Sequence, residues 1–156
     1  MVENVFKIRP ARPGDVETLF ELIRALADYE KLTDSVKGNP QSLAKHLFSQ
    51  PAYAEAIVAE VQGKLVGFAL FYPNYSTFLT KPGIHLEDLF VLPEYRRQGI
   101  GSALLKYVVN LAKERDFGRV EWNVLEWNKP AIIFYEKMGA HLLNEWRICR
   151  INLDEY

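Results

Sequence analysis

The stretch Leu86–Ser102, LEDLFVLPEYRRQGIGS, combines a strand pattern, a glycine-bearing turn and the start of a helix. Its first half is apolar around two adjacent acids, Glu87 and Asp88. Pro93 ends the predicted strand because proline has no N–H to donate to a sheet ladder. The glycines that follow allow backbone N–H groups to approach an anion, and the next helix adds the positive end of its dipole. The stretch therefore predicts a phosphate-binding loop directly after a strand that carries carboxylates.

The predicted loop has its own pattern, Arg96-x-x-Gly99-x-Gly101. It matches neither G-x-x-x-x-G-K-[ST] nor G-x-G-x-x-G, so nothing indicates a nucleotide triphosphatase or a Rossmann domain. The alternative interpretation is an ordinary strand-to-helix turn, which would carry no ligand. The residues expected to bind the anion are Arg96, Arg97, Gln98, Gly99, Ile100, Gly101 and Ser102.

Composition restricts the class of protein. The 156 residues are 49% hydrophobic and 25% charged, which suits one domain with a real core. A net charge of −1 gives no electrostatic basis for binding nucleic acid or an anionic membrane. The single cysteine and the spacing of the three histidines predict no disulfide and no metal site. Met1–Arg9 lacks an apolar signal core and no run approaches membrane-spanning length, so we expect a cytoplasmic protein.

Hydrophobic periodicity predicts alternating strands and helices along the chain. The expected strands are Val5–Pro10, Glu55–Val61, Leu65–Tyr72, Leu86–Leu92, Arg119–Leu125 and Trp146–Leu153. The expected helices cover residues 13–30, 40–49, 100–115 and 128–138, and residues 73–83 are expected to form a long loop. This order predicts one α/β (α+β) domain over residues 1–156, with a mixed β-sheet flanked by helices.

Three separated segments resemble one family. Arg96–Ser102 resembles the acetyl-CoA loop of the GCN5-related N-acetyltransferases (GNAT), and Trp127–Ala131 with Phe134–Gly139 resembles their W-N-x-P-A and F-Y-x-x-x-G segments. Within the family, Ala27–Glu30 and Leu86–Val91 are most similar to spermidine/spermine (diamine) N-acetyltransferases and the related thialysine acetyltransferases. The resemblance covers nearly the whole chain and implies an acetyl-CoA-dependent N-acetyltransferase that forms a homodimer.

The same resemblance implies how acetyl-CoA is held. It implies a sheet that splays after its fourth strand, with the pantetheine arm in the gap. An opened strand edge offers the N–H and C=O groups that such an amide-bearing arm requires. The residues implied to contact the arm, besides the phosphate loop, are Leu89, Phe90, Val91, Asn128, Lys129, Pro130 and Ala131.

Acetyl transfer to an amine needs a base and an acid. An alkylamine with a pKa near 10.4 must lose a proton, at a cost of about 4.6 kcal/mol at pH 7. The resemblance implies Glu87 as the base and Tyr135 as the acid that protonates the departing thiolate; Tyr135 packed in a core beside Phe134 is the alternative. In a regular strand Asp88 would point away from Glu87, and only a bulge would bring the two together. His85 shares the face of Glu87, and a part for Asp88 or His85 as base stays open.

The amine is expected to meet acidic and aromatic side chains. A diamine or polyamine such as spermidine or putrescine carries several positive charges and favours an acidic lining. The alternative substrate is the side-chain amine of a small amino acid, thialysine or a lysine analogue. A weaker alternative is a non-catalytic CoA-binding regulatory module. The amine contacts implied by the resemblance are Tyr29, Glu30, Glu87, Glu121, Trp122 and Asn123.

Overall fold

The computed structural model describes residues 5–156, so the first four residues of the predicted domain lie outside the described residues. The chain divides into two compact units, Met1–Asn123 and Val124–Tyr156. The first unit contains the β-sheet and three α-helices, and the second contains one helix. Because the chain divides in this way, a single domain over residues 1–156 stays a prediction.

The sheet of the first unit has five strands in the order β1-β2-β3-β4-β5. Strands β1 to β4 pair antiparallel with their neighbours, and β5 pairs parallel with β4, so the predicted mixed sheet is confirmed. The strands are β1 (Phe6–Pro10), β2 (Glu55–Val61), β3 (Lys64–Ser76), β4 (Lys81–Val91) and β5 (Val120–Glu121). The helices of this unit are α1 (Val16–Tyr29), α2 (Pro40–Phe48) and α3 (Ile100–Glu114), with short 3₁₀ turns at Pro13–Asp15, Thr33–Ser35 and Pro93–Tyr95.

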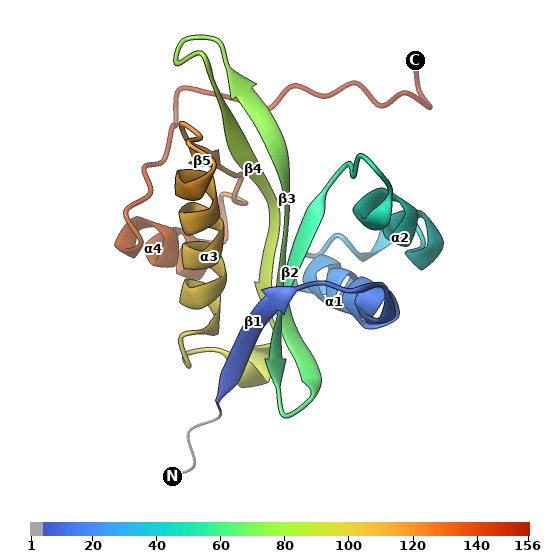
Figure 1. The fold of residues 1–156 in the computed structure, drawn as a ribbon. Coiled ribbons are helices and arrows are strands. Elements are labelled where there is room, and N and C mark those ends of the chain that lie inside the picture. The colour runs from blue at the N-terminus through green and yellow to red at the C-terminus, as the bar shows by residue number, and fades with distance from the viewer. Residues whose placement is uncertain (1–4) are drawn as a thin grey trace. The chain divides into compact units, whose positions relative to one another are not determined.

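The core of this unit follows from the alternation of side chains along its strands. In β3, Phe68 and Leu70 face α1 and α2, where Phe68 packs with Leu19 and Val58 in one buried cluster. The opposite face is covered by α3, whose Leu104 and neighbouring apolar residues are buried (Figure 1). Burial on both faces explains why β2 and β3 are apolar along most of their length instead of alternating with polar residues.

The prediction of a long loop over residues 73–83 is wrong. Strand β3 continues to Ser76 and β4 begins at Lys81, so the connection is short and the two strands form a long hairpin. Gly83, the last residue of the predicted loop, lies inside β4. A Cβ at Gly83 would lie 2.7 Å from Asn74 Oδ1 and 2.8 Å from the Arg119 carbonyl oxygen. Glycine at this position therefore allows a close backbone approach inside a strand, which is a common role of glycine in sheets.

Two predicted strands also differ from the structure. The strand predicted at residues 119–125 is only Val120–Glu121, which pairs with β4 at Ile84 and His85 alone. The strand predicted at residues 146–153 does not form, and residues 146–153 have no helix or strand assignment. Alternating apolar residues favour a strand only where a neighbouring strand satisfies the backbone hydrogen bonds, and neither segment has such a neighbour along its length.

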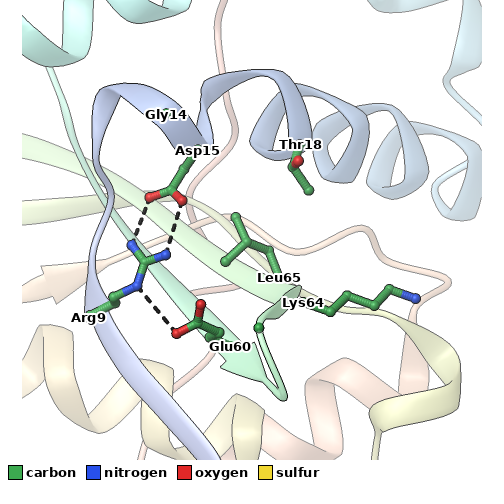
Figure 2. A pocket seen from close by; sticks show the side chains of 8 residues that line it. Arg9, Gly14, Asp15, Thr18, Glu60, Lys64 and Leu65 are labelled. Atoms are coloured by element: carbon green, nitrogen blue, oxygen red, sulfur yellow. Dashed lines mark hydrogen bonds and ion pairs between the residues drawn. The ribbon is translucent and has the colours of Figure 1, made fainter.

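A buried ion pair lies at the point where β1 leads into α1. The Arg9 guanidinium donates two hydrogen bonds to Asp15, at 2.7 and 3.0 Å, and its Nε lies 3.6 Å from Glu60 Oε2 (Figure 2). These side chains line a pocket of about 400 Å³ between the start of α1 and the β2–β3 hairpin, with Lys64 at its rim. Its two acids and two bases balance one another, so the pocket carries no net charge toward a ligand.

We expect Asp15→Asn to lower the free energy of unfolding by about 2 kcal/mol at pH 7, because it leaves a buried guanidinium with Glu60, at 3.6 Å, as its one charged partner. The hydrogen bond from Arg9 lowers the pKa of Asp15. The folded state then holds its proton less tightly than the unfolded state. The stability from this pair is therefore present above about pH 4 and is lost as pH falls through the lowered pKa.

Urea unfolding from pH 2 to 7 measures this difference. The matched control is Asp116→Asn, which breaks the exposed pair with Lys81 and is expected to change stability little. Equal losses in the two variants would contradict a stabilising role for the Arg9–Asp15 pair.

Candidate active site

A β-bulge lies where the two adjacent acids occur in β4. Leu70 pairs with Asp88 and Phe71 pairs with Leu86, so Glu87 is an extra residue between two consecutive pairs. A bulge turns the extra residue out of strict alternation and re-aims its side chain. The rule that adjacent residues face opposite ways therefore does not apply here, and both acids take part in one network of charges.

The Glu87 carboxylate has two polar neighbours, one from each strand of the hairpin. The Tyr72 hydroxyl donates a 3.1 Å hydrogen bond to Glu87 Oε2, and His85 Nε2 lies 3.4 Å from the same oxygen. Tyr72 and His85 are cross-strand partners, and their rings lie 5.1 Å apart. Glu87 is half-exposed, at 51% of its side chain, whereas His85 is largely buried at 20%. This carboxylate is thus open to solvent on one side and held on the other.

Asp88 lies in a less hydrated place and close to other acids. Burial, then the charge of Glu87 and then that of Glu30, raise the pKa of Asp88 to about 7. Burial also raises the pKa of Glu30, which follows the last residue of α1. We call Glu30, Glu87 and Asp88 the carboxylate cluster. Because three acids repel one another and favour a cation between them, the cluster is a suitable place for a positively charged group.

The backbone of β4 beyond the bulge presents hydrogen-bonding groups to the β5 side. The Leu92 N–H donates to the Val66 carbonyl of β3 at 2.8 Å. Because antiparallel pairs alternate between bonded and non-bonded, the backbone of Phe90 faces β3 and that of Leu89 and Val91 faces away from it. Among the described residues, β5 pairs with β4 only before this segment. The sheet is therefore splayed after its fourth strand, as predicted.

Arg96 connects the loop after β4 to the end of α1. Its Nε donates to the Val91 carbonyl at 2.8 Å, and its guanidinium lies 4.7 Å from the ring centre of Tyr29 and 5.5 Å from that of Phe90. The sequence predicts that Arg96 binds a phosphate. In the structure its charge lies against two aromatic rings. One of these rings belongs to Tyr29, the residue directly before Glu30 of the carboxylate cluster.

The loop before α3 has the geometry of an anion-binding turn. Arg97 and Gly99 both have positive φ, 62° and 84°, and Arg97, Gln98 and Gly99 are exposed. The N-cap residue of α3 is Gly99, which has no side chain, and the first helical hydrogen bond runs from the Ala103 N–H to the Gly99 carbonyl. The backbone N–H groups of Ile100 and Gly101 therefore come before the first helical bond, at the positive end of the helix dipole.

The second unit carries the other predicted residues on one helix, α4 (Lys129–Lys137). Asn128 caps this helix, with its Oδ1 accepting a 3.4 Å hydrogen bond from the Ala131 N–H, and Pro130 lies in the first turn. Tyr135 is two turns further on, with its ring 5.4 Å from that of Phe134. The side-chain oxygen of Asn128 thus fixes the start of α4.

Within the first unit, the structure places the predicted amine contact Glu121 beside β4. Glu121 is the cross-strand partner of His85 and lies 3.7 Å from Arg119 Nε, and Trp122 and Asn123 follow it. Tyr72 is not among the site residues that the sequence predicts. Its position two residues after Leu70 is evident from the sequence, but its contact with Glu87 depends on a bulge, which the alternation of side chains does not indicate.

Among residues 5–156, no group of three or more His, Cys, Asp or Glu side chains is placed to hold a metal ion. Within the same range, no helix is both long enough and apolar enough to cross a membrane.

Comparison with known proteins identifies the class. The acetyltransferase (GNAT) family matches residues 19–140. A solved structure of an integron cassette protein from the mobile metagenome of V. cholerae has a TM-score of 0.77 and 25% identity, over 94% of this chain and 92% of that one. The chain belongs to the GNAT family and is an acyltransferase, and members of this family use acetyl-CoA as co-substrate.

Curated relatives are similar over most of the chain. The thialysine N-epsilon-acetyltransferase of Bos taurus is 40% identical over 146 residues, which is 88% of this chain and 85% of the relative. The L-ornithine N5-acetyltransferase NATA1 of Arabidopsis thaliana is 34% identical, over 95% of this chain and 85% of the relative. The spermidine/spermine N(1)-acetyltransferase-like protein 1 of Homo sapiens is 31% identical over 97% of this chain but only 23% of its own length.

Proposed function

We propose that this enzyme transfers the acetyl group of acetyl-CoA to the side-chain primary amine of a small amino acid of the thialysine or ornithine type. The observation that carries the proposal is the carboxylate cluster at the bulge of β4, directly before the open edge at Leu89 and Val91. An amine between these acids would lie beside the strand segment suited to bind the pantetheine arm. The higher identity to thialysine and ornithine enzymes favours an amino acid over a polyamine.

For acetyl-CoA, the chain offers two kinds of backbone donor. We propose that Leu89 and Val91 pair with the pantetheine amides and that the turn at residues 97–102 binds the pyrophosphate. Phe90 then contributes its side chain to the core, because its backbone faces β3. Asn128, Lys129, Pro130 and Ala131 remain proposed contacts on α4.

The reaction breaks the C–S bond of the thioester and forms an amide C–N bond. Glu87 is proposed to accept the first proton that the ammonium group loses, directly or through one water. Tyr135 is proposed to donate a proton to the thiolate sulfur and to recover the second proton of the nitrogen as the amide forms. A backbone N–H of the β4 edge, such as that of Val91, would polarise the thioester carbonyl. No covalent enzyme intermediate is required, and the one cysteine has no assigned part.

Diamines and polyamines are the second candidate class of substrate. Three carboxylates near one another favour a substrate with more than one positive charge, which spermidine or putrescine has. An amino acid also carries a carboxylate that needs a donor. Arg96 is the proposed donor, because its Nη groups remain beside Tyr29 while its Nε is bonded to Val91. The homodimer implied by the family resemblance and the expected cytoplasmic location stay predictions.

A parallel assay tests the substrate class. The wild-type enzyme with acetyl-CoA is given thialysine, ornithine, lysine, putrescine, spermidine or spermine, and CoA release is measured with a thiol reagent. We expect kcat/KM for thialysine or ornithine to exceed that for putrescine and spermidine by at least about tenfold, roughly 1.4 kcal/mol of transition-state binding. A reversed order would establish the polyamine alternative. Binding of acetyl-CoA without turnover on any amine would instead favour a regulatory module.

A further inference from the structure

We propose that Tyr72 and His85 form a positioning pair that fixes the Glu87 carboxylate through one of its oxygens and leaves the other oxygen for the amine. This inference rests on the proposed function, in which Glu87 accepts the proton of the amine. Tyr72 and His85 are not catalytic residues in this scheme, because both act through Glu87. Their contribution is to hold the base in one orientation.

Two groups lie against one oxygen of the Glu87 carboxylate. The Tyr72 hydroxyl and His85 Nε2 approach the same oxygen, Glu87 Oε2, at 3.1 and 3.4 Å. A carboxylate with one oxygen hydrogen-bonded to Tyr72 and lying against the His85 ring cannot rotate freely about its last torsion, so its second oxygen, Oε1, has a fixed direction. A base held in this way loses less conformational entropy when the amine arrives.

The bulge explains why Glu87 needs such support. A bulged residue has no cross-strand partner to restrict its side chain, and half of the Glu87 side chain is exposed. Tyr72 and His85 are paired with each other across β3 and β4, with their rings 5.1 Å apart. Both rings are therefore fixed by the regular pairing of β3 and β4, and their contacts with Glu87 restrict the side chain of this bulged residue.

Tyr72 is chemically suited to act as a permanent donor. Burial and the charge of Glu87 raise the pKa of the Tyr72 phenol above its ordinary value, so the hydroxyl keeps its proton through the neutral range. The other titratable groups near the pair are Asp88 on β4, whose charge also raises the pKa of Tyr72, and Glu121 on β5, which is opposite His85 and lies 3.7 Å from Arg119 Nε.

Removal of the hydroxyl tests the pair. With the best amine of the parallel assay, we expect Tyr72→Phe to lower kcat about tenfold and to leave the dissociation constant of CoA unchanged, since one hydrogen bond to a charged group is lost. The matched control is Tyr75→Phe on the same strand, where the ring is exposed and the hydroxyl is remote from the proposed base. We expect this control to retain wild-type kcat.

A double-mutant cycle separates positioning from a general structural effect. In a Glu87→Gln background, we expect Tyr72→Phe to change kcat by less than about twofold, because there is no base left to orient. A tenfold loss in both backgrounds would overturn the proposal, as would wild-type kcat in Tyr72→Phe. His85→Asn should likewise lower kcat in the wild-type background and not in the Glu87→Gln background.

A second readout does not depend on activity. The pKa of Tyr72 can be followed by NMR of tyrosine labelled at the ring carbon next to the hydroxyl, with the signal assigned by its absence in Tyr72→Phe. We expect this pKa to fall in Glu87→Gln, because the neighbouring negative charge is removed. An unchanged pKa would overturn the contact itself. Absence of acetylation of every amine, with the pKa change present, would instead reject the proposed function and leave the contact standing.

Discussion

Tyr135→Phe is expected to lower kcat for acetyl transfer by about 10²–10³-fold, the usual contribution of a positioned general acid. The departing thiolate has a reference pKa near 8.5 and the phenol one near 10, so proton donation is uphill by only about 2 kcal/mol. Phenylalanine keeps the ring, and with it the packing beside Phe134. The loss should therefore be in kcat and not in folding or in binding of CoA. Steady-state kinetics and calorimetric titration with CoA measure the two quantities.

Two comparisons make this prediction specific. Tyr156→Phe, which changes an exposed tyrosine of the same unit, should have wild-type kinetics. If Tyr135→Phe also kept wild-type kcat, Tyr135 would be a packing residue beside Phe134 and the proposed acid would have to be sought elsewhere. A loss of kcat that is equal for amines of different pKa would agree with a role at the leaving group.

The sequence predicted the parts of the fold that depend on local pattern. The apolar run of β4, the stop at Pro93 and the glycine turn before α3 are all encoded within a few neighbouring residues, and the structure has each of them in place. Expectations about strand length were less accurate, because a strand extends only as far as its neighbour does. The end of β5 at Glu121 and the lack of a strand at residues 146–153 illustrate this dependence on a partner.

The arrangement of the candidate site could not be predicted in the same way. Whether Glu87 and Asp88 share a face depends on one extra residue in the register between β3 and β4, and register is set by packing of the whole sheet. The contact of Tyr72 with Glu87 and the position of Arg96 on Tyr29 arise from the same tertiary placement. The motifs thus predicted which residues belong to the candidate site, but not which residues each of them contacts.

The carboxylate cluster has a cost for folding that follows from its charges. Asp88 has its pKa raised to about 7 by burial and by two neighbouring acids, so the folded state holds a proton that the unfolded state releases near pH 4. Stability from this group is therefore complete below about pH 4 and falls as pH rises toward 7. Above pH 7 the ionised carboxylate is unfavourable in the folded protein until a cation neutralises it. An amine substrate would supply that cation.

Asp88→Asn is accordingly expected to stabilise the free enzyme at pH 8 by about 2–4 kcal/mol, because the amide copies the neutral acid and removes the buried charge. At pH 3, where the acid is neutral in both states, the variant and the wild type should have equal stability. The same substitution should raise KM for the amine about 10–100-fold, since one charge facing the cation is lost. Urea unfolding between pH 3 and 9 and amine kinetics at pH 8 measure these effects.

The control for Asp88→Asn is Asp34→Asn, an exposed aspartate of the turn at Thr33–Ser35, which should leave stability and KM unchanged at every pH. A stability difference that does not vary with pH would show that Asp88 is not a buried acid whose ionisation opposes folding. Greater stability at pH 8 with an unchanged KM would place the amine away from Asp88. The expected combination, greater stability with weaker amine binding, requires that the charge which destabilises the free protein is the one that attracts the substrate.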